Sequence, residues 1–310
     1  IGHGAFSHAL ENSIVKGISH EEISLKFMKS LNKEFDGKLT LAISIFEGEY
    51  HRRFFNQLVS SQLDVDRLDY LKRDSFYTGV AEGNISSERL IVMMTVANDE
   101  LVIEHKGIYS VENFLIARRL MYWQVYLHKT GVLAESMLVN VLQRAKELVL
   151  QNIEVPATKA LRYFLHHQIT EENFTEETLQ VFSTLDDYDM LSAIKEWVEH
   201  SDTVLSKLSR MIIHRNLLKI ELQNKPFSDS EIRVHRNKLS GQLKIDEDLM
   251  RYFVFSGKIS NKAYDSEKPI KILYNSGKTE DIVQASDQLN LQALTKPVEK
   301  YYRCYPKKML

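Results

Sequence analysis

The chain has 310 residues, of which 44% are hydrophobic and 26% are charged. This composition fits a globular protein with one large or two smaller hydrophobic cores. Forty Lys and Arg residues nearly balance 42 Asp and Glu residues, and the net charge of −2 excludes a global field that would attract nucleic acid or an anionic membrane. No apolar run reaches the roughly 20 residues of a membrane helix. A single cysteine, Cys304, cannot form an internal disulfide. We therefore expect a soluble, cytoplasmic protein without a membrane partner.

The first eight residues, IGHGAFSH, place two histidines among small side chains, and Glu11 follows three residues later. Two imidazoles and a carboxylate in this spacing predict the wall of an active site, which small residues would let a ligand approach. The alternative is a glycine-rich loop with two surface histidines. No strand or helix precedes the motif, so we expect that part of it lies upstream of residue 1.

Helical patterns dominate from residue 19 to about residue 242. Ser19 and Glu22 form a capping box, and apolar residues recur every four positions from Ile23. We therefore predict a helix with His20 in its first turn, where the helix N-terminus favours anions.

The segment from Leu63 to Asp74 has two helical faces. Asp66, Tyr70 and Asp74 recur every four residues and share one face. The other face is apolar and should pack on the core; it carries Val65, Leu68 and Leu71. The polar face either binds a ligand or is simply solvated.

Residues 89–105 predict a β-hairpin, because apolar runs at 92–96 and 101–103 flank Asn98-Asp99. Further helices are expected from Ser110 to about Lys129 and near 132–151, 156–167, 187–199 and 202–222.

After a second capping box at Ser228, short aromatic and β-branched runs predict strands at 252–255, 270–274 and 301–305, with a turn at 275–278. The expected fold is mainly α. It has a helical body at 1–224 with a β-hairpin insertion, and a small α+β lobe at 225–310.

Three segments carry a family resemblance. The opening octet resembles the end of the HD-domain phosphohydrolase signature, His-Asp-Ile-Gly-His-Gly-x-Phe-Ser-His, in the form found in deoxynucleoside triphosphate triphosphohydrolases. Residues 64–74 are similar to the second signature of that branch, Asp-Val-Asp-x-x-Asp-Tyr-x-x-Arg-Asp. Arg118 lies eight residues before Tyr126 of Tyr-Leu-His-Lys, as in family members. The three matches occur in the family's order and, with a weaker continuation through 215–217 and the C-terminal lobe, cover most of the chain.

The resemblance implies a divalent metal held by an upstream His, a His-Asp pair and Asp66. The first three ligands are absent from this chain. One carboxylate cannot make a transition-metal site, so we expect the chain by itself to bind metal poorly. Nothing distinguishes Mg, Mn, Fe, Ni and Zn.

The resemblance also implies roles for the histidines. His3, His8 and His20 match histidines around the phosphates and the departing oxygen, and Glu11 matches the acidic partner of His8. An imidazole with a pKa near neutrality can protonate a leaving 5′-oxygen, and a carboxylate can orient it. His8 and Glu11 are therefore the predicted acid–base pair. The alternative for His20 is a surface position at the end of a helix.

Five further residues match substrate contacts of the family. Arg67 and Arg118 match basic residues on the phosphate chain, for which the planar guanidinium is well suited. Tyr70 and Asp74 match residues near the sugar 3′-hydroxyl. Tyr126 matches an aromatic residue that crowds the 2′ position, and its alternative role is helix packing.

The implied reaction is metal-dependent hydrolysis of a deoxynucleoside triphosphate to a deoxynucleoside and inorganic triphosphate. Two alternatives stay open: an HD phosphohydrolase of another nucleotide or phosphoester, and a non-catalytic nucleotide-binding or assembly module. Analogy with the family suggests a homo-oligomer.

Other clusters are weaker signals. His166-His167 and the aspartates at 186, 187 and 189 lack further metal ligands at a recognisable spacing, so we interpret them as solvated or helix-capping. The end of the chain combines tyrosines with basic residues: Lys296, Lys300, Arg303, Lys307 and Lys308. Such a composition suits nucleic acid or a nucleotide effector, but alternating tyrosines on a strand more often pack.

Overall fold

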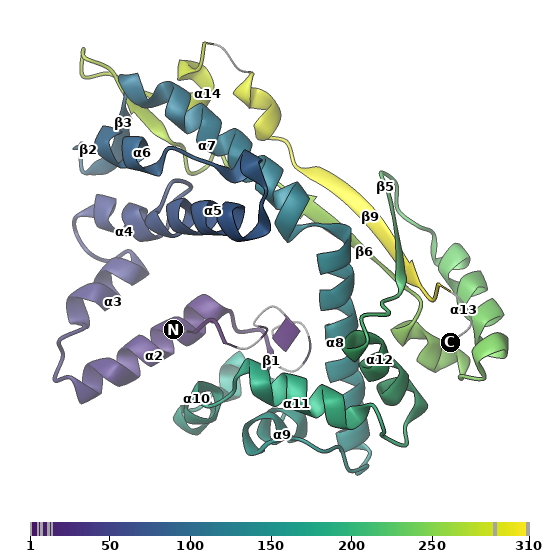
Figure 1. The fold of residues 1–310 in the computed structure, drawn as a ribbon. Helices are drawn as coiled ribbons and strands as arrows, with labels where there is room; N and C mark the ends of the chain where they lie inside the picture. The colour runs from purple at the N-terminus through teal and green to yellow at the C-terminus, as the bar shows by residue number, and fades with distance from the viewer. Residues whose placement is uncertain are drawn as a thin grey trace. The chain divides into compact units, whose positions relative to one another are not determined.

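The computed structural model describes residues 2–4, 6, 9–10, 13, 15–287 and 290–307. Its internal contacts divide the chain into two compact units (Figure 1). Unit 1 comprises residues 1–36, 129–258 and 300–310, and unit 2 comprises residues 37–128 and 259–299. Each unit therefore combines segments that are far apart in the sequence.

Unit 1 is mainly helical. Its helices are α2 (His20–Glu34), α8 (Lys129–Leu150), α9 (Lys159–His166), α10 (Glu176–Ser183), α11 (Asp187–Trp197), α12 (Thr203–Ile213) and α13 (Asp229–Leu243), with 3-10 turns η4 (Glu171–Asn173) and η5 (Glu247–Tyr252). A short β1 (Val15–Lys16) pairs in parallel with β4 (Ile169–Thr170). A three-stranded sheet has the order β5 (Lys219–Gln223), β9 (Val298–Tyr305), β6 (Phe255–Asn261), and residues 259–261 of β6 and 298–299 of β9 are counted in unit 2. The central helix α8 buries one side in the core, which includes Trp197 and Phe164.

Unit 2 combines helices with a small mixed sheet. Its helices are α3 (Thr40–Glu47), α4 (Arg53–Val59), α5 (Val65–Thr78), α6 (Ser87–Met93), α7 (Ile108–Met121) and α14 (Ile282–Ala285). Its shorter helical turns are η1 (Ala81–Gly83), η2 (His105–Gly107), the π-helical η3 (Tyr122–Tyr126) and η6 (Leu291–Leu294). The strand order is β2 (Met94–Ala97), β3 (Glu100–Glu104), β7 (Lys271–Leu273), β8 (Thr279–Asp281).

The units do not coincide with the segments 1–224 and 225–310 that we expected. The reason is the parallel pairing of β3 with β7, in which Ile103 lies opposite Ile272. This pairing brings residues from the predicted C-terminal lobe into the sheet of the predicted hairpin, and both isoleucines are buried in the same core.

The predicted mainly α fold class is confirmed, as are several local elements. Ser19 and Ser228 cap α2 and α13 with full capping boxes. Strands β2 and β3 form the predicted hairpin, and Asn98 and Asp99 adopt φ angles of 51° and 63°, as a two-residue turn requires. The aspartates near 186 cap a helix as expected, because the Asp186 side chain accepts hydrogen bonds from two backbone N–H groups of α11.

Other boundaries were wrong. The helix predicted at 202–222 ends at Ile213, because Arg215 adopts a left-handed φ of 54° and the chain then enters β5. Residues 89–93 are helical rather than extended, and α7 begins at Ile108 instead of after Ser110. The strand predicted at 252–255 begins only at Phe255.

No helix in the described part of the chain combines the length and apolarity needed to cross a bilayer.

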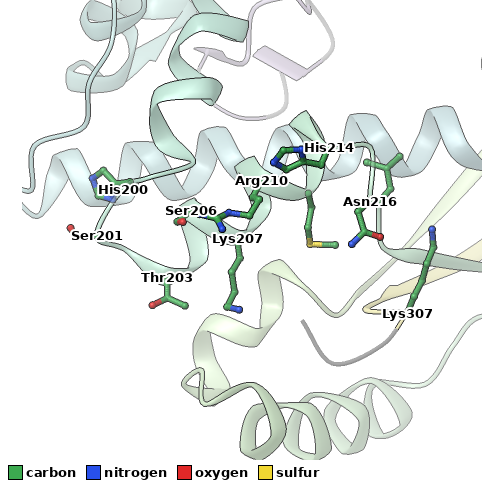
Figure 2. A pocket seen from close by; sticks show the side chains of 11 residues that line it. His200, Ser201, Thr203, Ser206, Lys207, Arg210, His214, Asn216 and Lys307 are labelled. Atoms are coloured by element: carbon green, nitrogen blue, oxygen red, sulfur yellow. The ribbon is translucent and has the colours of Figure 1, made fainter.

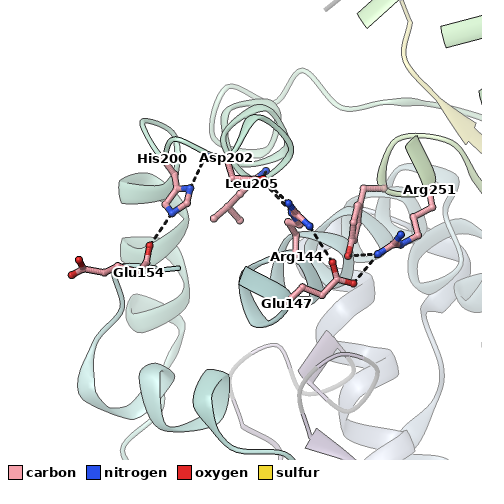
Figure 3. A network of polar contacts seen from close by, with 8 residues as sticks. Arg144, Glu147, Glu154, His200, Asp202, Leu205 and Arg251 are labelled. Atoms are coloured by element: carbon pink, nitrogen blue, oxygen red, sulfur yellow. Dashed lines mark hydrogen bonds and ion pairs between the residues drawn. The ribbon is translucent and has the colours of Figure 1, made fainter. Parts of the chain in front are cut away.

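A partly buried ion network ties α8 to α12 within unit 1 (Figure 3). Arg144 donates from Nε and Nη2 to the Asp202 carboxylate, at 3.1 and 2.6 Å, and from Nη1 to Glu147 at 3.2 Å. Glu147 also accepts from Arg251 at 2.9 Å. Burial opposes the charged form of Asp202, but the bonds from Arg144 and from the Leu205 N–H outweigh it and lower the pKa of this carboxyl. Every nitrogen of the Arg144 guanidinium thus has a partner.

Replacing Asp202 with Ala should lower the free energy of unfolding by about 3–5 kcal/mol, since a buried guanidinium loses its main partner and α12 loses its N-cap. Denaturant unfolding measures this. Glu199→Ala is the matched control, because Glu199 pairs with Arg210 at the exposed surface and should contribute less than about 1 kcal/mol. Equal losses for the two variants would contradict the importance of the network.

A second charged cluster joins β5 to β9. Glu221 accepts hydrogen bonds from Tyr305 and from Arg303, the latter at 2.7 Å, and also pairs with Lys219. The bond from Tyr305, then that from Arg303, lowers the pKa of Glu221 to about 2. Arg303 of the basic C-terminal segment is therefore committed to an internal contact.

Because the folded-state pKa of Glu221 lies below its ordinary value of 4.5, its stabilising contribution is complete above that value and is lost as the pH falls toward 2. Glu221→Gln should therefore be less stable than the unmodified chain at pH 7, and the difference should shrink as the pH is lowered from 4.5 to 2. Denaturant unfolding across this range tests the prediction. A difference that does not change with pH would show that the charge of Glu221 is unimportant.

Candidate functional site

Helix α5 begins at a charged N-terminus. The buried Asp64 caps the helix by accepting a hydrogen bond from the Arg67 N–H at 2.8 Å, and its carboxylate also pairs with the Arg67 guanidinium. Nη1 of Arg67 donates in addition to the Ser61 carbonyl at 2.7 Å. Nε of Arg67 is buried and has no hydrogen-bond partner among the described residues. These contacts fix the position of Arg67 in the first turn.

The two faces of α5 are separated largely as predicted. Leu68 and Leu71 are buried, and Tyr70 and Asp74 are half-buried. Asp66, on the same polar side, is exposed. Val65 was wrongly assigned to the packing face, because at the first position of the helix its side chain is 51% exposed.

Helix α7 changes its winding at the end that carries the predicted ligand contacts. After Met121 the chain continues as the π-helical turn η3, which the Leu127 N–H closes by donating to the Tyr122 carbonyl at 2.7 Å. Such wider turns are rare and are frequent at functional sites. Here the turn carries Tyr122 and Tyr126, whose rings lie edge to face with centroids 5.2 Å apart.

Side chains from α5 and η3 meet directly. The Tyr126 hydroxyl donates to Oδ2 of Asp74 at 2.7 Å, and the Tyr70 and Tyr126 rings contact edge to face at 5.7 Å. Burial, followed by the bond to Asp74, raises the pKa of Tyr126. Burial and a hydrogen bond with Tyr122 likewise raise the pKa of Tyr70, although Arg118 and Arg67 act in the opposite direction. Both phenols therefore stay protonated and keep a hydrogen to donate at neutral pH.

Arg118 adjoins this group of tyrosines through Tyr122. Only 9% of its surface is exposed, and its guanidinium carbon lies 5.7 Å from the centre of the Tyr122 ring. Nε and Nη1 of Arg118 are buried and have no hydrogen-bond partner within the described part of the chain. Unit 2 thus brings together all five predicted substrate-contact residues: Arg67, Tyr70, Asp74, Arg118 and Tyr126.

The predicted histidines belong to unit 1. His3 and His20 lie with their ring centroids 5.1 Å apart, and His20 occupies the first turn of α2 as predicted, with Nε2 3.2 Å from Glu21. The predicted pair His8 and Glu11 lies outside the described residues.

The small residues of the opening motif pack against the protein itself. The Gly2 N–H donates to Ser24 at 2.8 Å, and a Cβ on Gly2 would lie 2.3 Å from the His20 carbonyl oxygen. A Cβ on Gly4 would lie 2.6 Å from the Phe182 ring. Close packing against α2 and α10 therefore explains these glycines without a ligand.

Tyr122 is a residue of this site that the sequence analysis did not select. It contacts Tyr70, Arg118 and Tyr126. A signal was present, because Tyr122 lies four residues from both Arg118 and Tyr126 and so shares their side of the helix. The assignment of catalytic and substrate-binding roles to individual residues stays a prediction.

The chain matches known proteins along most of its length. The family model described as "HD associated region" matches residues 85–164. A phosphohydrolase from Bacteroides thetaiotaomicron of known crystal structure is 52% identical, with a TM-score of 0.94 over 99% of this chain and 77% of that one. The uncharacterized protein YwfO from Bacillus subtilis is 30% identical over 276 residues, which cover 87% of this chain and 61% of YwfO.

A shorter match carries a more specific name. The deoxynucleoside triphosphate triphosphohydrolase SAMHD1 homolog from Dictyostelium discoideum is 28% identical over 166 residues, 48% of this chain and 32% of that protein. Together with the matches above, this shows that the chain belongs to the HD-domain phosphohydrolase family. It spans about three fifths of the length of YwfO.

HD-domain phosphohydrolases generally use divalent metals. Among the residues that the structure describes, no group of three or more His, Cys, Asp or Glu side chains is placed to hold a metal ion. Asp66 can supply one oxygen, but a divalent transition metal needs several converging donors. The described residues therefore do not by themselves fit a metal site.

The bond between Tyr126 and Asp74 should couple α5 to η3 energetically. In a double-mutant cycle with Tyr126→Phe and Asp74→Ala, we expect a coupling of about 1–2 kcal/mol in the free energy of unfolding, since a hydrogen bond to a carboxylate is stronger than a neutral one. The control cycle pairs Tyr126→Phe with Asp69→Ala, whose side chain pairs with Arg73 at the surface of α5. Additive effects in both cycles would show that the bond contributes nothing.

Proposed function

We propose that this chain forms the body of a deoxynucleoside triphosphate triphosphohydrolase, which cleaves its substrate at the α-phosphate and releases a deoxynucleoside and inorganic triphosphate. The observation that carries the proposal is the buried guanidinium of Arg118 with two unpartnered nitrogens among the described residues. The D. discoideum relative is named for this activity, which supports the choice of substrate class.

A comparison of two buried arginines shows why Arg118 favours an anionic ligand. Arg144 is as deeply buried, but Asp202 and Glu147 neutralise it and accept hydrogen bonds from all three nitrogens. Arg118 has no carboxylate partner among the described residues and gains only the contact with the Tyr122 ring. Leaving a buried charge unpaired costs several kcal/mol. A bound phosphate would supply the missing acceptors and offset this cost.

Arg67 supports the same assignment from the neighbouring helix. Its charge acts on Tyr70 together with that of Arg118, and its Nε has no described partner. Nη1 of Arg67 is already used by Asp64 and Ser61. Arg67 would therefore contribute a single N–H and its charge, and Arg118 would provide the bidentate contact to the phosphates.

The pair Tyr126 and Asp74 suits the sugar. Asp74 accepts from Tyr126 through Oδ2, so Oδ1 can accept a hydrogen bond from the 3′-hydroxyl of a deoxyribose. The Tyr126 ring would then occupy the space beside C2′ and leave no room for a second hydroxyl. This arrangement would favour deoxyribose over ribose.

The remaining roles follow the family resemblance. A water molecule would add to the α-phosphorus as the bond from phosphorus to the 5′-oxygen breaks. The protonated His8, oriented by Glu11, would give its proton to the departing 5′-oxygen, and the proton lost by the water would return to the imidazole directly or through solvent. His3 and His20, which lie together in unit 1, would donate hydrogen bonds to phosphate oxygens.

The test of this proposal measures triphosphate release from each of the four deoxynucleoside triphosphates by the full-length protein with added divalent metal. Arg118→Lys should lower kcat/KM about ten- to hundredfold although the charge is kept, because the planar fork is lost and a hydrogen bond to a charged group contributes about 1.5–3 kcal/mol. Arg119→Lys, one residue further along α7, is the matched control and should have little effect.

Three results would overturn the proposal. Unchanged kcat/KM in both Arg118→Lys and Arg118→Ala would place the phosphates elsewhere. Release of orthophosphate or pyrophosphate in place of triphosphate would indicate a different phosphohydrolase. Nucleotide binding without any hydrolysis by the metal-loaded, full-length protein would indicate a binding module.

A further inference from the structure

A second candidate ligand site lies in unit 1 and uses none of the residues above. It is a pocket of about 850 Å³. Its lining comes from α12, from the segments directly before and after α12, and from Lys307, which follows β9. Figure 2 shows His200 and Ser201 at one end of this pocket and Lys307 at the other, with Lys207 and Arg210 between them. We call it the α12 pocket.

The pocket exists because only one side of α12 is covered. Thr203, Lys207, Arg210 and His214 follow each other at helical spacing and line the pocket. The other side of the helix packs into the core of unit 1 through Val204, Leu205 and Leu208, and the buried Met211 lies where the core meets the pocket. The core contact therefore holds the polar side in a fixed orientation toward the pocket.

The wall at the start of α12 is held by internal bonds. The Asp202 N–H donates to Nδ1 of His200 at 2.9 Å, so Nε2 carries the hydrogen and donates to the Glu154 carbonyl at 3.0 Å. The Asp202 carboxylate is committed to Arg144. The pocket is thus bordered by a rigid segment, and its one nearby aspartate is neutralised.

The lining is strongly basic for a chain of net charge −2. Lys207, Arg210 and Lys307 supply three cations, and the lining also contains two imidazoles. No carboxylate occurs among the described residues that line the pocket. The side chains of Lys207, His214 and Lys307 have no hydrogen-bond or ion-pair partner in the described part of the chain, although the His214 backbone N–H donates to the Arg210 carbonyl. Nη2 of Arg210 donates hydrogen bonds to the Glu199 carboxylate and to the Val198 carbonyl. The other two nitrogens of its guanidinium have no hydrogen-bond acceptor among the described residues.

The lining also limits the chemical class of the ligand. A volume of this size suits a small molecule. No Phe, Tyr or Trp lines the pocket among the described residues, so it lacks the aromatic platform on which nucleic acid bases stack. The side chains of Ser201, Thr203 and Asn216 instead offer hydrogen bonds to oxygen atoms.

We propose that the α12 pocket binds a small ligand whose charge is carried by phosphate groups, held by Lys207, Arg210 and Lys307. The ligand is an inorganic polyphosphate or a phosphorylated small molecule without a requirement for a base. Lys307 of the basic C-terminal segment thus has a role in ligand binding, whereas Arg303 of the same segment donates a hydrogen bond to Glu221.

The test uses calorimetric titration of the full-length protein with inorganic triphosphate. The double variant Lys207→Gln, Lys307→Gln should lose one binding event or weaken it about tenfold or more. Lys207→Arg should retain it, because the charge is kept. The matched control is Lys195→Gln, an exposed lysine of α11 outside the pocket, which should leave the affinity unchanged. Binding should weaken as the salt concentration rises.

Two further arms distinguish the α12 pocket from the candidate site in unit 2 and identify the source of the phosphate. Arg118→Ala should keep the binding event that the double variant loses, since the two sites lie in different units. Ribose 5-phosphate and inorganic pyrophosphate distinguish an organic from an inorganic source, and weaker competition by the pyrophosphate would favour the organic one. Unchanged triphosphate affinity in the double variant with an unchanged melting temperature would overturn the proposal. So would binding of a short single-stranded DNA oligonucleotide much more tightly than any small phosphate, because the ligand would then be nucleic acid.

Discussion

The packing of α5 against α7 is the contact on which the candidate site in unit 2 depends. Leu68 and Leu71 from α5 are buried in the same core as Phe114 and Met121 from α7. Because these apolar sides face each other, the polar sides of the two helices are rotated to a common border. The hydrogen bond from Tyr126 to Asp74 forms at that border. The π-helical turn after Met121 contributes by placing two tyrosines there.

The two units differ in whether a buried arginine has a carboxylate partner. In unit 1, Arg144 and Asp202 neutralise each other, and the same aspartate caps α12, so the charge contributes to the stability of the fold. In unit 2, Arg118 is buried without such a partner among the described residues. Burial of an unpaired guanidinium is unfavourable for the empty protein, and the same burial strengthens its attraction for a phosphate because the local dielectric is low.

A nearly neutral chain must bind anions through local clusters of cations. The cluster around Arg118 is small, buried and rich in tyrosine, which suits a ligand with a sugar and a specific orientation. The α12 pocket is open, basic and lined by hydroxyl and amide groups, with no Phe, Tyr or Trp among its described residues, which suits phosphate groups alone. The two sites therefore differ in the part of a ligand that each can recognise.

Short-range features of this protein were determined by its sequence alone. The capping boxes at Ser19 and Ser228 and the turn at Asn98-Asp99 involve groups a few residues apart, so no distant contact is needed to form them. The common face of Tyr70 and Asp74 follows in the same way from helical spacing. The tertiary structure decided the pairing of β3 with β7 and the burial of Arg118, because both depend on segments that are distant in the sequence. Spacing can place side chains on one face of a helix, but only packing against another element determines which of them lose contact with water and which remain able to bind a ligand.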